Sequence, residues 1–99
     1  MDSDLVFIQN WYRAQCNGTW EHGYGVKINT LDNPGWAVRI NLKDTPLEKV
    51  PMEKVLRDNG SDDWLYLEKK DAEFIASGDP DKLAAILSAF REWSTSALN

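Results

Sequence analysis

The chain has 99 residues, of which 42% are hydrophobic and 27% charged, and its formal net charge is −5. This size and balance predict one globular domain spanning residues 1–99, with a core large enough to need neither a disulfide nor a metal. One cysteine and one histidine are too few for most catalytic and metal-binding constellations, so we expect no cofactor.

The first predicted element is a helix from Ser3 to Cys16. Ser3 is a favourable N-cap, and Asn17-Gly18 is a stop signal. The residues at the N-terminus are acidic where a secretory signal is basic, and no apolar run reaches the roughly 20 residues of a membrane span. We therefore expect a cytoplasmic protein that does not enter a membrane. One broad apolar face of the helix is made by Leu5, Ile8, Trp11, Tyr12 and Cys16.

From Trp20 the apolar period changes to two, which predicts two antiparallel strands joined as a hairpin. The first strand places Trp20, His22 and Tyr24 on one face, and the second runs from Trp36 to Lys43. Between them, Asn33-Pro34-Gly35-Trp36 has the residue order of a type II turn, which requires positive φ at Gly35. We expect the indoles of Trp20 and Trp36 to be largely buried between sheet and helices.

Two further strands and a helix are predicted in the second half. A strand from about Val50 to Arg57 is followed by the turn Asp58-Asn59-Gly60-Ser61 and a strand from Trp64 to Lys69. Asp79 and the following proline open the last helix, which frays from Ser94. The order helix, four strands, helix predicts an α+β fold: a four-stranded antiparallel meander with the N- and C-terminal helices packed on one face.

The strand from Trp64 to Lys69 is apolar on both faces. Leu65 and Leu67 lie on one face, and Trp64 and Tyr66 lie on the other. One face therefore packs under a helix, whereas the other needs a cover or serves in binding.

The negative charge is concentrated in the second half of the chain. Residues 1–57 are neutral overall, whereas residues 58–81 hold eight acidic side chains and two lysines. Such a segment repels phosphate backbones and attracts a basic protein, so we expect no nucleic-acid ligand. A solvated face that only keeps the protein soluble is the alternative. The residues predicted to bind a protein are Asp58, Asp62, Asp63, Trp64, Tyr66, Glu68, Asp71 and Glu73, and the first three are expected to be exposed and without structural contacts.

Cys16 and His22 are the two residues that could supply a thiol nucleophile with its base, or ligands for a metal ion. A thiol nucleophile needs a base within hydrogen-bond reach, but Cys16 ends an apolar helical face, where cysteine behaves as a small hydrophobe. His22 is expected to be partly buried in the sheet, and Glu21 points to the opposite face, which disfavours a metal site. No catalytic or metal-binding residue is predicted. A small thiol-dependent enzyme using Cys16 and His22 is one alternative reading, and an unrelated protein-binding module is another.

Several short sequence motifs, most of them containing aromatic residues, resemble those of a known family. They are Trp11-Tyr12, Cys16-Asn17-Gly18, Trp20-Glu21-His22-Gly23-Tyr24-Gly25 and Thr30-Leu31-Asp32-Asn33-Pro34-Gly35-Trp36, followed more loosely by Leu42, Asp63-Trp64, Phe74, Gly78-Asp79-Pro80, Leu83 and Phe90 to Trp93. Together they resemble the bacterial polymorphic-toxin immunity proteins classed as immunity protein 53.

The resemblance implies a small, non-catalytic α+β protein of the cytoplasm that binds and blocks a cognate toxin domain. If that toxin is a nuclease, its surface is basic, and an acidic and aromatic face can occupy it. We expect a monomer when the protein is free. The residues of these motifs are expected mainly to stabilise the fold. They are Trp11, Tyr12, Trp20, Glu21, His22, Tyr24, Asp32, Asn33, Pro34, Gly35 and Trp36.

Overall fold

The computed structural model describes residues 3–97, which form three helices and five strands. Met1 and Asp2, which contribute to the localisation prediction, lie outside the described residues. The elements are α1 (Asp4–Gln15), α2 (Trp20–Gly23), β1 (Val26–Leu31), β2 (Gly35–Asn41), β3 (Val55–Asp58), β4 (Trp64–Lys70), β5 (Glu73–Gly78) and α3 (Leu83–Ala97).

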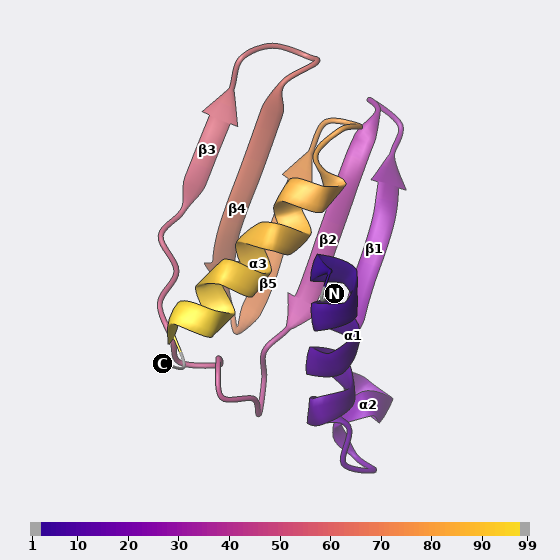
Figure 1. The fold of residues 1–99 in the computed structure, drawn as a ribbon, viewed down its shortest axis with the longest axis vertical. Coiled ribbons are helices and arrows are strands. Elements are labelled where there is room, and N and C mark those ends of the chain that lie inside the picture. Colours follow the sequence, from indigo (N-terminus) through magenta and orange to yellow (C-terminus); the bar gives the residue numbers. More distant parts are fainter. Residues whose placement is uncertain (1–2, 98–99) are drawn as a thin grey trace.

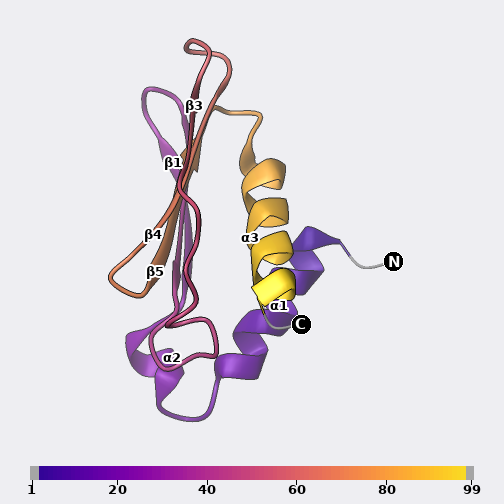
Figure 2. The ribbon, with the colours of Figure 1, turned by 90° about the vertical axis from the view of Figure 1, so that its left-hand side faces the viewer.

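The fold has two layers, a fully antiparallel sheet and a pair of helices. The strand order is β1-β2-β5-β4-β3, and α1 and α3 lie on the same face of the sheet (Figures 1 and 2). The predicted α+β class and the terminal helices on one face are confirmed. The four-stranded meander is wrong, because residues 3–97 form five strands and β5 is inserted between β2 and β4.

The strand missing from the prediction is β5. The turn before it is tight, with positive φ at both Asp71 (53°) and Ala72 (60°). Phe74 and Ala76 of β5 are buried beneath the helices. The small residues that follow Ile75 have weak strand propensity, so the alternation in this segment does not stand out in the sequence.

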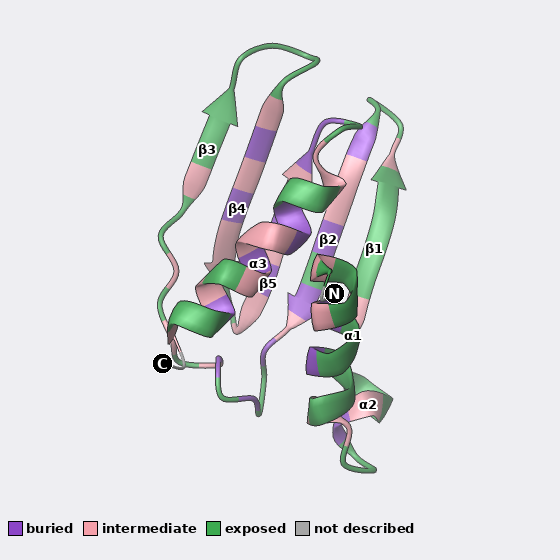
Figure 3. Ribbon diagram, in the orientation of Figure 1, coloured by how far each residue is buried: buried purple, intermediate pink, exposed green. Residues whose placement is uncertain are grey.

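The core fills the space between the sheet and the helices. Phe74 of β5 meets Phe90 of α3 edge-on, with 5.2 Å between ring centroids. Burial is concentrated on β2, β4 and β5, whereas the edge strands β1 and β3 are mostly exposed (Figure 3). The other fully or nearly fully buried core side chains include Ile8, Trp11, Val38, Ile40, Leu65, Leu67, Ile86 and Leu87.

Helix α1 begins as predicted but turns a slightly different face to the core. The hydroxyl oxygen of Ser3 accepts a hydrogen bond from the backbone N–H of Val6, which confirms Ser3 as the N-cap. Leu5, predicted to lie on the apolar face, is 63% exposed. Phe7 takes the inner position instead and packs against Phe90.

Residues Trp20–Gly23 form one helical turn and not the predicted strand. The carboxylate of Glu21 accepts hydrogen bonds from the backbone N–H groups of Asn17 and Gly18, at 3.0 and 2.8 Å. The side-chain oxygen of Asn17 in turn accepts from the N–H of Trp20. These local bonds stabilise a helix start, so strand parity does not apply here. His22 is consequently exposed on α2 and not partly buried in the sheet.

The indole N–H groups of three tryptophans donate hydrogen bonds to backbone carbonyl oxygens in segments outside the helices and strands. The indole N–H of Trp20 donates to the Lys43 carbonyl oxygen, that of Trp36 to Pro80, and that of Trp93 to Pro51, all at 2.8 to 2.9 Å. Trp20 is 4% exposed, which confirms its predicted burial. Trp36 is only partly buried, because it lies near the end of β2.

The turn between β1 and β2 is not the predicted type II turn. The Asn33–Pro34 peptide bond is cis, and Gly35 does not have positive φ. Gly35 is required for a different reason. A Cβ atom there would collide with the carbonyl oxygen of Gly78 and press on the ring of Trp64. The glycine lets β5 and an aromatic ring approach the backbone closely.

We expect Gly35→Ala to lower the free energy of unfolding by about 1–3 kcal/mol, the usual cost of overpacking. Gly23→Ala is the matched control, since a Cβ at Gly23 meets nothing within 4 Å and its φ is not positive. Urea unfolding of the two variants measures the difference. Equal stabilities would show that the close approach at Gly35 relaxes at no cost.

Several element boundaries also differ from the prediction. β3 begins at Val55 and not near Val50, and α3 begins at Leu83, four residues after Asp79. The last helix continues through Ser94, which is 1% exposed, to Ala97. The hairpin turn between β3 and β4 is confirmed, and its Gly60 has φ of 112°.

Candidate functional site

The candidate site lies on the face of the sheet opposite α1 and α3. In β4, Leu65 and Leu67 are buried under the helices, and Trp64 and Tyr66 alternate with them onto the open face. The ring centroids of Trp64 and Tyr66 are 5.3 Å apart, at an interplanar angle of 45°. The predicted division of this strand into a covered and an uncovered apolar face is therefore confirmed.

Neighbouring strands extend the apolar surface around these two rings. Tyr66 pairs with Leu56 of β3, whose side chain is 67% exposed. On the other side of β4, β5 contributes Ile75. Ile75 pairs with Glu68, which follows Tyr66 on the same face of β4. We call Leu56, Trp64, Tyr66 and Ile75 the aromatic patch. Leu56 and Ile75 were not among the predicted site residues; the exposed Leu56 belongs to an edge strand whose register the sequence does not reveal.

A shallow hollow of about 500 Å³ lies beside the two rings. It separates the β1–β2 turn from the hairpin between β3 and β4, and we call it the hairpin hollow. One oxygen of Asp58, Oδ1, accepts a hydrogen bond from the N–H of Gly60 at 3.1 Å. Lining residues include Leu31, Asn33, Asp58, Trp64, Tyr66 and Ser77.

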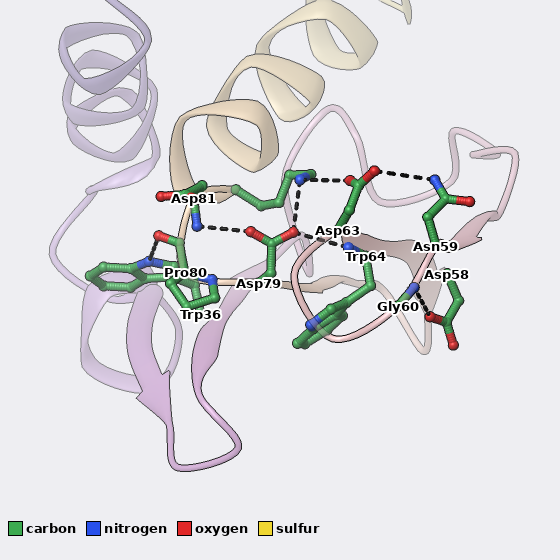
Figure 4. A network of polar contacts seen from close by, with 10 residues as sticks. Trp36, Asp58, Asn59, Gly60, Asp63, Trp64, Asp79, Pro80 and Asp81 are labelled. Carbon is green, nitrogen blue, oxygen red and sulfur yellow. Dashed lines mark hydrogen bonds and ion pairs between the residues drawn. The ribbon is translucent and has the colours of Figure 1, made fainter.

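The backbone of Trp64 is held by a buried carboxylate. Oδ2 of Asp79 accepts from the N–H of Trp64 at 2.9 Å and from Nζ of Lys82 at 2.7 Å, and Oδ1 accepts from the N–H of Asp81 (Figure 4). Asp79 is fully buried. The ammonium of Lys82 and the two backbone N–H groups lower the pKa of the Asp79 carboxyl to about 2, against the opposing effect of burial.

The same lysine also binds Asp63. Nζ of Lys82 lies 2.9 Å from an Asp63 oxygen, and the side chain of Asn59 donates to the other oxygen (Figure 4). These contacts lower the pKa of Asp63, chiefly through the hydrogen bond from Lys82. The expectation that Asp58 and Asp63 have no structural contacts is therefore wrong. Asp58 accepts a hydrogen bond from Gly60 within the β3–β4 hairpin, and Asp63 is bound by Asn59 and Lys82. Asp62 is exposed, as predicted.

The predicted binding residues do not form one acidic surface. The sheet register places Asp58, Glu68 and Glu73 on the open face with the two aromatic rings. Glu73 is neutralised by Arg39, at 3.2 Å. Asp71 lies in the β4–β5 turn at the other end of the strands.

A second hollow of about 530 Å³ lies at the α2 end of β1 and β2. Its lining combines residues from the predicted aromatic motifs with basic side chains that were not among the predicted site residues. The thiol of Cys16 donates to the Tyr12 carbonyl oxygen at 3.4 Å, so its hydrogen bond goes to the backbone. Within residues 3–97, no group of three or more potential ligands is placed to hold a metal ion. Lining residues include Tyr12, His22, Tyr24, Lys27, Arg39 and Glu73.

The Asp79 carboxylate should make the protein acid-sensitive. Its pKa is lowered from 3.8 to about 2 in the folded state, so its contribution to stability is complete above about pH 4 and is lost as the pH falls toward 2. We expect Asp79→Asn to be less stable than the parent at pH 7 and to lose less of its remaining stability between pH 4 and 2. Urea midpoints across this range measure both slopes. Parallel slopes would assign the acid sensitivity to other carboxyls.

The fold and the site define a small α+β domain with helices on one face of the sheet and an open aromatic face on the other. The family model described as immunity protein 53 matches residues 5–95, and the chain belongs to this family. Membership indicates an immunity function against a toxin, which is the partner that the family implies, and such proteins are generally non-catalytic. No curated protein and no solved structure matches the chain. No helix within residues 3–97 is long and apolar enough to cross a membrane.

Proposed function

We propose that this protein binds a cognate toxin domain through the open face of its sheet and thereby neutralises it. The observation that carries the proposal is the aromatic patch: Trp64, Tyr66 and the exposed Leu56 lie on the sheet face opposite α1 and α3. Figure 2 shows both of these helices on the other face. Aromatic residues are enriched in protein interfaces and dominate their binding energy. The family supplies the class of partner.

The toxin that fits best has a basic surface, as nucleases do. Asp58 and Asp62 are exposed at the hairpin end of the sheet, Asp71 is exposed in the β4–β5 turn at the other end, and Glu68 adds a carboxylate beside Ile75. Charges of this kind accelerate encounter with a positively charged partner. We propose that the protein acts in the cytoplasm as a free monomer until it meets the toxin.

The proposal is tested by producing the protein together with the toxin domain encoded beside its gene. The parent protein should restore growth, and the two purified proteins should form a stoichiometric complex. If the toxin is a nuclease, the complex should also lack nuclease activity. Growth arrest despite normal amounts of folded protein would refute the function, and a complex that retains toxin activity would refute neutralisation by binding.

We expect the double variant Asp62→Asn, Asp71→Asn to bind the toxin about two- to fivefold more slowly at low salt, with little change in stability. Asparagine tolerates the positive φ of residue 71. Stopped-flow association at two ionic strengths measures the effect, which should shrink as salt rises. The control is Glu53→Gln, Glu92→Gln, which removes two exposed charges from outside the patch. Equal slowing by the control would indicate that net charge alone steers the encounter.

A further inference from the structure

We propose that the hairpin hollow receives an arginine side chain of the toxin, stacked on the aromatic rings and paired with Asp58. This inference rests on the proposed function and names the chemistry of the contact. A flat guanidinium suits the site because it stacks on aromatic faces and binds a carboxylate through two N–H groups.

The charged group of the hollow is arranged to accept a cation. Asp58 uses Oδ1 to accept the N–H of Gly60, which fixes the carboxylate in the hairpin turn. Asp58 is exposed, so Oδ2 can accept from a ligand without breaking that turn. Among the described residues that line the hollow, Asp58 is the one with a formal charge. An incoming carboxylate or phosphate would be repelled, whereas a cation is attracted.

The aromatic walls are fixed before any ligand arrives. The ring of Trp64 lies against the backbone at Gly35, where a side chain would displace it. The backbone of Trp64 is tied to the buried Asp79. Tyr66 packs beside Trp64 with 5.3 Å between ring centroids. A site that is already ordered loses little conformational entropy when it binds.

The volume of the hollow, about 500 Å³, leaves room for more than one side chain. Leu31, the last residue of β1, and Asn33 of the β1–β2 turn also line the hollow. The aliphatic part of an arginine can lie against Leu31 while its guanidinium reaches Asp58 and the rings. The hollow therefore suits an arginine that projects from a toxin segment lying across the sheet.

The test uses the whole protein and a probe that contains only the proposed group. N-acetyl-arginine amide is titrated to millimolar concentrations while the indole N–H signal of Trp64 is followed by NMR. N-acetyl-citrulline amide, which has nearly the same shape without the charge, is the matched probe. We expect saturable shifts at Trp64 with the arginine compound and markedly weaker ones with citrulline. No shift at Trp64, or equal shifts with both probes, would overturn the proposal.

Two variants separate this contact from general attraction. Asp58→Asn keeps an oxygen that can accept from the N–H of Gly60. It should lower the affinity for the arginine probe about fivefold, which corresponds to the energy of an exposed ion pair. Asp62→Asn removes the same charge from the same hairpin but outside the hollow, and should change the affinity less than twofold. Equal losses in the two variants would overturn the specific site.

The growth assay distinguishes this inference from the proposed function. A protein that neutralises the toxin but binds neither probe refutes the arginine contact alone. A protein that binds the arginine probe through Asp58 but gives no protection refutes the proposed function alone.

Discussion

Replacing Trp20 with alanine should lower the free energy of unfolding by about 3–5 kcal/mol, the range for large aromatic residues in a core. Trp20 is 4% exposed and stands edge-on to Trp11, with 6.1 Å between centroids. Its indole N–H also holds the Lys43 carbonyl, so the variant leaves both a cavity and an unpaired acceptor. Because small domains are stable by only about 5–15 kcal/mol, this is a large fraction of the total. Urea unfolding at neutral pH measures it.

Trp20→Phe isolates the hydrogen bond from the packing. It keeps most of the ring volume and should cost clearly less than the alanine variant. If alanine and phenylalanine are equally destabilising, the bond to Lys43 outweighs the packing. If Trp20→Ala changes stability by less than about 1 kcal/mol, Trp20 does not act as a core residue.

Replacing Trp64 with alanine should weaken toxin binding by at least about 30-fold, which corresponds to a hot-spot residue. The ring is partly buried on the open face, where a toxin would complete its burial. We expect a smaller loss of stability, about 1–2 kcal/mol, from its lost contacts with Gly35 and Tyr66. Calorimetric titration with the toxin domain, paired with urea unfolding, measures both quantities.

Trp36→Ala is the matched control, since Trp36 lies on the helix side of the sheet and donates to Pro80. It should destabilise the protein at least as much as Trp64→Ala while changing the affinity little. The opposite pattern, with affinity lost at Trp36 and kept at Trp64, would place the interface on the other face of the molecule.

The elements best predicted from the sequence are those in which the local signal and the tertiary environment agree. The Ser3 cap, the β3–β4 turn with Gly60, and the two faces of β4 all follow from residues within a few positions of one another. The alternation separates Trp64 and Tyr66 from Leu65 and Leu67, and the structure shows which of the two faces the helices cover.

The errors arise where a side chain or a distant strand decides the backbone. At Trp20–Gly23 the residues alternate as in a strand. A helical turn is favoured instead, because the Glu21 carboxylate accepts from the N–H of Asn17 and the Asn17 side chain accepts from the N–H of Trp20. At Gly35 the sequence predicts a type II turn. The glycine is required instead because the carbonyl oxygen of Gly78, which is remote in sequence, leaves no room for a Cβ atom. Close approaches between distant segments leave no local pattern to read.

The candidate site was only partly predictable, because counting charges does not reveal their partners. Of the acidic residues in 58–81, Asp79 is buried, Asp63 binds Lys82, and Glu73 binds Arg39. These pairings join positions on different strands or on the turn before α3. The exposed negative charge is therefore smaller and more local than the composition indicates.

The position of β5 also determines when the sheet can be completed during synthesis. β5 pairs with β2 on one side and β4 on the other, and without it β1–β2 and β3–β4 are two separate hairpins. Isolated two-stranded hairpins are at best marginally stable in water. A nascent chain that has not yet released Glu73–Gly78 from the ribosome has no strand to join them, and α3 comes later still. The face that carries the aromatic patch is thus complete only after Glu73–Gly78 has been made.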